Sequence, residues 1–149
     1  MSNTLNYPDQ SAHPALGLDY GESRIGVAAT DDFGILAHPV ETIPAYEISA
    51  SIQRITELVE TKKSKNLVIG LPLRLDGSEG ESVKKVRKFA AKLQAKLPNL
   101  PIHYVDESFT TSDAASKLHE AGRNAKKQKG LIDQAAAVEI LNRWMEELS

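Results

Sequence analysis

The stretch LGLDYGESRIGVA, residues 16–28, predicts two short strands joined by a tight turn, and the rest of the fold builds on this hairpin. Only Gly21, Glu22 and Ser23 separate the two apolar runs, and so short a connection makes the strands antiparallel neighbours. The first run contains Asp19, although strands disfavour aspartate. Because a buried carboxylate without a partner is costly, we expect Asp19 to face a compensating group.

The segments after this hairpin predict an α/β fold with a mixed sheet. Residues 35–43 are expected to form an edge strand, because Pro39 cannot donate a hydrogen bond to a neighbouring strand. Apolar runs and helical spacing predict the later elements, with Ser78 and Glu81 as a capping box for one helix. The expected strands are 66–72 and 101–107, and the expected helices include 48–59, 83–93, 111–122 and 131–147. Right-handed crossovers then give five strands in the order 3-2-1-4-5, with strand 2 antiparallel and helices on both faces.

Length and composition favour one domain that contacts its partners through local patches. The chain has 149 residues and a net charge of −2, so overall basicity does not indicate nucleic-acid binding. The absence of cysteine excludes disulfides, thiolate metal sites and cysteine nucleophiles. Residues 1–14 are polar and lack a secretory signal, so we expect a disordered tail before a domain at 15–149. No apolar run is long enough for a membrane span, and a cytoplasmic location is expected.

Three acidic residues from separate elements are expected to meet at the carboxyl edge of the sheet, where open α/β sheets bind ligands. Asp19 shares a strand face with small residues, and Glu107 follows directly where the last strand ends. Asp133 lies on a helical stripe that is otherwise apolar, so it is aimed toward the sheet rather than toward water. The other members of that stripe are Ala136, Ala137, Ile140, Leu141, Trp144 and Leu148. Strand alternation is expected to point Asp106 away from the side that Glu107 takes.

Each acid also has an ordinary explanation when it is taken alone. Asp133 could favour a helix N-terminus, Asp19 could bond to turn amides, and Glu107 could be a solvated loop residue. Together, however, three converging carboxylates would repel one another without a cation. Oxygen-only donors favour Mg²⁺ or Mn²⁺, and carboxylates that hold such ions suit phosphodiester hydrolysis. The sequence therefore predicts that Asp19 faces a divalent metal ion.

Four segments, in order, resemble the YqgF family of small bacterial proteins. These segments are GLDYGESRIGVAATD, VIGLPLRLDGSEGES, VDESFTT and LIDQAAAVEIL, and the resemblance covers residues 15–148. The family has an RNase H-like fold and is described as pre-16S rRNA nucleases and as Holliday junction resolvases. The resemblance implies that Asp19, Glu107 and Asp133 are its catalytic, metal-binding acids. Ser108 departs from the family's usual arginine, which puts the grip on the substrate in question.

The segment GRNAKKQKG, residues 122–130, is expected to form a basic loop next to the acids. Its cations could hold phosphates and give salt-dependent affinity, although a solvated basic loop is the common alternative. The candidate contacts are Arg123, Lys126, Lys127 and Lys129, with Arg24 as a weaker one. The four histidines, His13, His38, His103 and His119, are assigned to surface or strand positions without a catalytic role.

The acids, the basic segment and the resemblance together predict a cytoplasmic nuclease, dependent on Mg²⁺ or Mn²⁺, that acts on structured nucleic acid. The resemblance favours 5′-end processing of pre-16S rRNA, with the ribosomal subunit as a further partner and a monomer or homodimer as the assembly. A Holliday junction resolvase and a non-catalytic RNA-binding module remain alternatives. The hairpin is also similar to the phosphate-binding hairpin of the actin and sugar-kinase superfamily. Those proteins close two domains around ATP, however, and this chain has room for one.

Overall fold

The computed structural model describes residues 10–74, 76–107 and 125–148, with the backbone alone at residues 10 and 125–128. A short 3₁₀ helix, η1 (Gln10–Ala12), precedes the first strand. The other elements are β1 (Ala15–Tyr20), β2 (Arg24–Thr30), β3 (Ala37–Pro44), α1 (Ile48–Lys62), β4 (Asn66–Leu71), α2 (Glu81–Lys96), β5 (Ile102–Asp106) and α4 (Ala125–Leu148). The helix expected at residues 111–122 lies outside the described residues.

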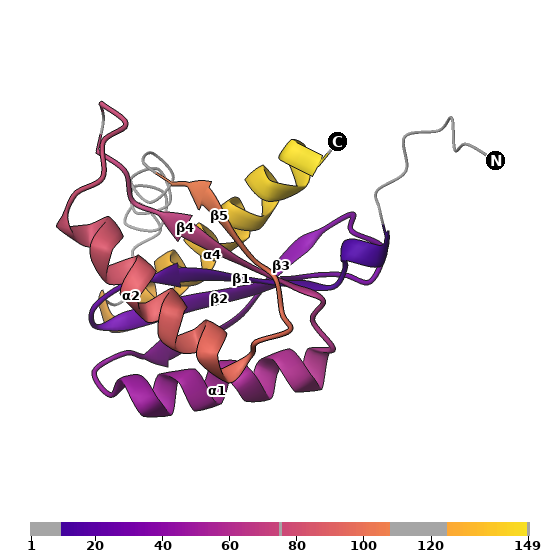
Figure 1. Cartoon of the computed structure of the whole chain (residues 1–149), viewed down its shortest axis with the longest axis horizontal. Coiled ribbons are helices and arrows are strands. Elements are labelled where there is room, and N and C mark those ends of the chain that lie inside the picture. Colours follow the sequence, from indigo (N-terminus) through magenta and orange to yellow (C-terminus); the bar gives the residue numbers. More distant parts are fainter. Residues whose placement is uncertain (1–9, 75, 108–124, 149) are drawn as a thin grey trace.

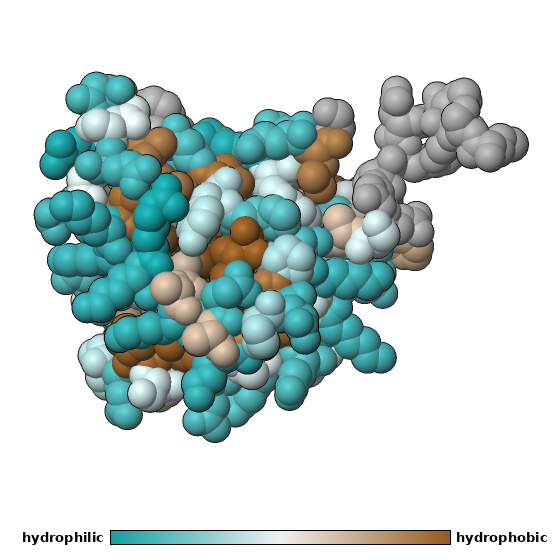
Figure 2. Space-filling model, in the orientation of Figure 1, coloured by the Kyte–Doolittle hydropathy of each residue, from teal (hydrophilic) through white to brown (hydrophobic). Residues whose placement is uncertain are grey.

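The sheet has the predicted strand order. Its five strands run β3-β2-β1-β4-β5, with β2 antiparallel to both of its neighbours and β4 parallel to β1 and β5. Helices α1 and α2 cover one face, and α4 crosses the other (Figure 1). The face on which α1 and α2 lie is mainly hydrophilic, with hydrophobic side chains showing between the polar ones (Figure 2). None of the helices in the described part of the chain has the length and apolar character to cross a membrane.

Strand β1 divides its side chains between two apolar clusters, as its alternation predicts. Leu16 and Leu18 join the cluster beneath α1 and α2, whereas Ala15 joins the one beneath α4. A Cβ atom on Gly17 would lie 2.5 Å from Cγ of Leu141, so glycine is what lets α4 pack this closely. The same alternation places Asp19 on the α4 side of the sheet.

Several predicted boundaries are wrong for identifiable reasons. Strand β3 begins at Ala37 rather than at residue 35, because the Asp31 carboxylate accepts backbone N–H groups from the preceding loop. The predicted capping box is absent: Gly80 is the N-cap of α2, and the Ser78 hydroxyl donates to Asp76 instead.

Helix α4 begins at Ala125, so the expected basic loop is wrong for residues 125–130, which are helical. Alanine, lysine and glutamine favour helices, and Gly130 does not interrupt this one. At that point α4 passes β3, and the Thr42 hydroxyl donates to the Gly130 carbonyl oxygen at 2.9 Å. Asp133 therefore lies inside the helix and not in its first turn.

The predicted tail ends earlier than residue 14. His13 is buried, with 2% of its surface exposed, and its Nδ1 lies 2.7 Å from the Thr30 hydroxyl oxygen. Its ring meets the Trp144 ring edge-on at a centroid distance of 5.4 Å. The assignment of His13 to a surface or strand position is therefore wrong, because aromatic packing and a hydrogen bond hold it in the interior.

Candidate active site

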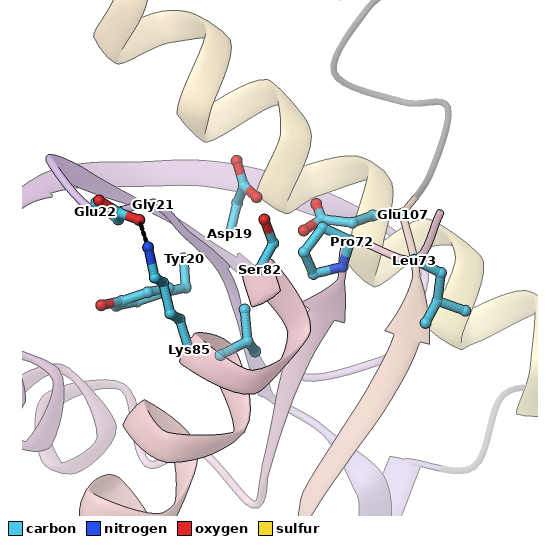
Figure 3. A pocket seen from close by; sticks show the side chains of 10 residues that line it. Asp19, Tyr20, Gly21, Glu22, Pro72, Leu73, Ser82, Lys85 and Glu107 are labelled. Carbon is cyan, nitrogen blue, oxygen red and sulfur yellow. Dashed lines mark hydrogen bonds and ion pairs between the residues drawn. The ribbon is translucent and has the colours of Figure 1, made fainter. Parts of the chain in front are cut away.

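Asp19 and Glu107 meet at the carboxyl edge of the sheet, although they come from strands that are not neighbours. Asp19 is on β1, and Glu107 follows β5, where its N–H donates to the Leu71 carbonyl oxygen at 3.1 Å. Strand β4 lies between them and carries Gly70 at this level. A Cβ atom there would lie 2.7 Å from Cδ of Glu107, so the glycine leaves the space that the Glu107 side chain occupies. The two carboxyl groups point toward one another across the opening in Figure 3.

Burial makes this carboxyl pair hard to ionise. Glu107 is 7% exposed, and its pKa is raised by burial and by the neighbouring negative charge of Asp19. The pKa of Asp19 is also raised by burial, and a hydrogen bond from Glu107 opposes that rise. A protonated Glu107 that donates to an ionised Asp19 accounts for both directions. A cation bound between the two carboxyl groups would favour their ionised forms and oppose this rise in pKa.

Asp133 lies beside this pair but is engaged with a cation of the chain itself. Its Oδ2 lies 2.6 Å from Nε of Arg24, which is at the start of β2. Burial raises the pKa of Asp133, and the Arg24 guanidinium opposes the rise. A Cβ atom on Gly26 would lie 2.0 Å from the backbone oxygen of Asp133, so only glycine lets α4 approach β2 here. The negative charge of Asp133 contributes to the raised pKa of Asp19.

The structure therefore assembles the three predicted acids in part. Asp19 and Glu107 are in contact, whereas Asp133 is their electrostatic neighbour and is held by Arg24. Across residues 10–74, 76–107 and 125–148, no group of three or more acidic or histidine side chains is arranged to hold a metal ion. The two buried carboxyl groups nevertheless supply the hard oxygen donors that Mg²⁺ and Mn²⁺ prefer.

A pocket of about 390 Å³ opens beside the carboxyl pair, on the side of α2 (Figure 3). It is bounded by the β1–β2 turn, the segment after β4 and the first turns of α2. The residues that line it are Asp19, Tyr20, Gly21, Glu22, Pro72, Leu73, Ser82, Lys85, Val86 and Glu107. Lys85 forms an ion pair with Glu22 across its mouth. Ser82 and Lys85 were not predicted as site residues, and the basic composition of α2 was the one signal in the sequence that pointed to Lys85.

The structure describes the side chains of only some of the predicted nucleic-acid contacts. Arg24 is paired with Asp133, and Lys129 is exposed on α4. Lys126 and Lys127 belong to α4, but their side chains, like Arg123 as a whole, lie outside what the structure describes. Asp106 and Glu107 were expected to point to opposite sides, and the structure agrees: Asp106 is exposed while Glu107 is buried.

Known proteins resemble this chain over almost its whole length. The model of the RuvX family, described as Holliday junction resolvase, matches residues 13–147. A relative from Cutibacterium acnes is 43% identical over 147 residues, which cover 98% of this chain and 91% of the relative. One from Picosynechococcus is 44% identical over 132 residues, covering 89% and 91% of the two chains. Both relatives carry the name "Putative pre-16S rRNA nuclease".

Solved structures show the same fold at low sequence identity. The Thermus thermophilus RuvC bound to a Holliday junction superposes with a TM-score of 0.58 at 11% identity, over 91% of this chain and 95% of that one. The yeast mitochondrial Holliday junction resolvase gives a TM-score of 0.55 at 16% identity, over 95% and 80% of the two chains. At these identities the likeness concerns the fold, and it agrees with the predicted RNase H-like architecture.

Proposed function

The chain belongs to the RuvX family, and on that basis we propose that it is a metal-dependent nuclease that cleaves structured precursor 16S rRNA. The observation that carries the proposal is the buried pair of Asp19 and Glu107 at the carboxyl edge of the sheet, beside an open pocket. Two buried carboxyl groups with raised pKa values beside a pocket are typical of functional sites. The relatives at 43% and 44% identity, by their name, support precursor rRNA as the substrate.

In this proposal Asp19 and Glu107 would hold Mg²⁺ or Mn²⁺ in their ionised forms. Asp133 would be the third ligand, which would require that Arg24 release its carboxylate. The bound metal would supply activation of water and stabilisation of the leaving oxygen. Arg24 would then be free to turn its planar guanidinium toward a phosphate of the substrate, a group that it can bind in bidentate fashion. Lys129, with Arg123, Lys126 and Lys127, would hold phosphates further along the nucleic acid.

A Holliday junction resolvase is the second candidate, because the family model carries that description and RuvC shares the fold. Cutting two strands of a symmetric junction would call for a symmetric dimer of this chain. For the rRNA nuclease, a monomer suffices, the cytoplasm is the expected location, and the ribosomal subunit is the expected setting of the substrate. The two candidates share one active site and differ in substrate and assembly.

A side-by-side cleavage assay tests the proposal. The protein is given a 16S-precursor leader RNA and a four-way DNA junction, each with Mg²⁺, Mn²⁺ or EDTA. Asp19→Asn removes one member of the buried pair, and Asp32→Asn makes the same change at an exposed site across the sheet. We expect metal-dependent RNA cleavage that Asp19→Asn abolishes and Asp32→Asn leaves unchanged. Junction cleavage would favour the resolvase, and RNA binding without any cleavage would favour a non-catalytic module.

A further inference from the structure

The pocket beside the carboxyl pair continues along α2 into a second hollow. This hollow, of about 180 Å³, is lined by Tyr20, Ile48, Lys85, Lys88, Phe89 and Lys92. Tyr20 and Lys85 line both spaces, so the two hollows adjoin at these side chains, and we call the pair of hollows, which begins at Asp19 and Glu107 and follows the helix surface, the furrow. A furrow that opens at the active site has the position of a path for the substrate.

Three lysines, Lys85, Lys88 and Lys92, face this furrow, and we call them the α2 lysine track. Their spacing of three and four residues places them on one face of the helix. At a rise of 1.5 Å per residue they extend over roughly 10 Å of its length. The track thus begins at the active-site pocket and leads away from it.

The track is not neutralised by the chain's own acids, as an ordinary solvated face would be. Helix α2 carries six basic residues and one acidic residue, in a chain whose net charge is −2. Lys88 and Lys92 have no ion-pair partner within residues 10–74, 76–107 and 125–148. On α1, by contrast, Arg54 pairs with both Glu41 and Glu57.

Lys85 is paired, but its partner is replaceable. Its ion pair with Glu22 is exposed to solvent on both sides, and such pairs contribute little to stability. A phosphate at the mouth of the pocket would be a competing anion for the same ammonium group. Glu22 thus occupies the place of a phosphate when no substrate is bound.

An aromatic ring lies where the two hollows meet. Tyr20 stacks on Phe89 with ring centroids 4.6 Å apart, so the phenol is backed by the core and borders both spaces. Lysines that follow a backbone, together with an aromatic ring for the bases, are the usual means of binding a single strand. The pocket's volume of about 390 Å³ is that of a small-ligand site.

We propose that a single strand of the substrate leaves the active site along α2, with its phosphates on Lys85, Lys88 and Lys92 and a base against Tyr20. This inference rests on the proposed nuclease function and specifies its substrate: the nucleic acid is unpaired on one side of the bond that is cut. The predicted contacts on α4 lie on the other face of the sheet, so the track is a separate binding surface.

Binding of a short single-stranded RNA, measured by fluorescence anisotropy in EDTA, tests the track without cleavage. Lys88→Gln/Lys92→Gln removes two of its charges, and Lys65→Gln/Lys96→Gln makes the same charge change at exposed lysines that line neither hollow. We expect the track variant to bind about tenfold more weakly, with a salt-dependence slope lower by about 1.4. The control variant should bind like the unaltered protein. All four lysines are exposed, so both variants should have the melting temperature of the unaltered protein.

Three results would overturn the inference. The track variant could bind the single-stranded RNA with unchanged affinity. It could lose more affinity for a blunt duplex than for the single strand, or lose as much affinity for an acidic peptide as for the RNA. Hydrolysis of a small chromogenic phosphodiester, which needs only the metal centre, separates this failure from failure of the proposed function. The track variant should retain that hydrolysis, and Asp19→Asn should lose it. If Asp19→Asn retains it, the proposed active site is wrong, and the inference falls with it.

Discussion

The carboxyl groups of Asp19 and Glu107 lie close together across the strand that separates them (Figure 3), because that strand carries a glycine where the Glu107 side chain passes. The parallel arrangement of β1, β4 and β5 brings both acids to one edge, and Gly70 lets them touch. Gly26 has the same role on β2, because its missing side chain leaves room for the backbone of Asp133. Glycines of the sheet therefore set the geometry of the acids as much as the acids' own positions do.

Gly70→Ala is expected to disable the site without replacing any of the acids. The added Cβ would lie 2.6 Å from Cδ1 of Ile140 and 2.7 Å from Cδ of Glu107, so both side chains must shift. Overpacking of this kind costs about 1–3 kcal/mol of unfolding free energy. A displaced Glu107 should lower the cleavage rate by roughly 10²-fold. Thermal unfolding and single-turnover cleavage measure the two effects, and full activity in a folded Gly70→Ala protein would contradict this account.

The sequence made the sheet predictable because its signals were local. Alternation in β1 placed Asp19 on the face that α4 covers, and the position of Glu107 after an apolar run placed it at the strand's end. The order of the strands followed from one short turn and the handedness of crossovers. These features depend on neighbouring residues along the chain, which a single sequence displays.

What the sequence did not reveal depends on contacts between distant elements. Gly130 suggests a helix boundary by composition, yet α4 continues through it beside Thr42. The pairing of Arg24 with Asp133 joins residues 109 positions apart, and no local pattern announces it. The α2 lysine track looks like a solvated helix face until the fold sets it beside Tyr20 and the active-site pocket.

Gly130→Ala is expected to stabilise the protein without changing its activity. The added Cβ would lie 3.5 Å from Oγ1 of Thr42, an ordinary van der Waals contact, so nothing needs to move. Alanine is favoured over glycine inside a helix by about 0.5–1 kcal/mol. The melting temperature should therefore rise by roughly 2–4 °C. A fall in melting temperature would mean that α4 does not continue through this residue.

Arg24→Ala is expected to tighten metal binding while weakening the grip on RNA. In the proposed site Arg24 would compete with the metal ion for the Asp133 carboxylate, and its removal would free that ligand. The same change removes a guanidinium that would contact a phosphate, so the KM for RNA should rise. Calorimetric titration with Mn²⁺ and steady-state cleavage measure the two effects separately. Arg24 is 40% exposed but Asp133 only 14%, so Arg24→Ala leaves a largely buried carboxylate without its partner and should cost about 1–3 kcal/mol of unfolding free energy.

Asp133→Asn supplies the opposite case for the Arg24 experiment. It removes the third ligand and should weaken Mn²⁺ binding, whereas Arg24→Ala should strengthen it. Equal weakening in both variants would show that Arg24 helps to hold the metal rather than competes with it. Arg24→Lys should not restore the KM for RNA, because a lysine cannot make the bidentate phosphate contact.

The metal-free protein is expected to lose stability through its active site as the pH rises. The pKa values of Asp19 and Glu107 are both raised in the folded state, chiefly by burial. Above the ordinary carboxyl pKa of about 4, the folded chain therefore holds more protons than the unfolded chain. The free energy of unfolding contributed by the pair is then greatest at acid pH and falls as the pH rises toward the raised values.

Glu107→Gln removes one of the two carboxyl groups with raised pKa values, so it isolates the effect of the pair. Melting temperatures in EDTA, measured from acid to neutral pH, should fall less steeply for Glu107→Gln than for the unaltered protein. Asp32→Asn, an exposed change at the opposite edge, should leave the slope unaltered. If the folded state binds Mg²⁺ as proposed, the ion should raise the melting temperature most at neutral pH, where binding favours the ionised carboxylates. The same stabilisation by Mg²⁺ in Glu107→Gln would place the metal away from this pair and would contradict the proposed site.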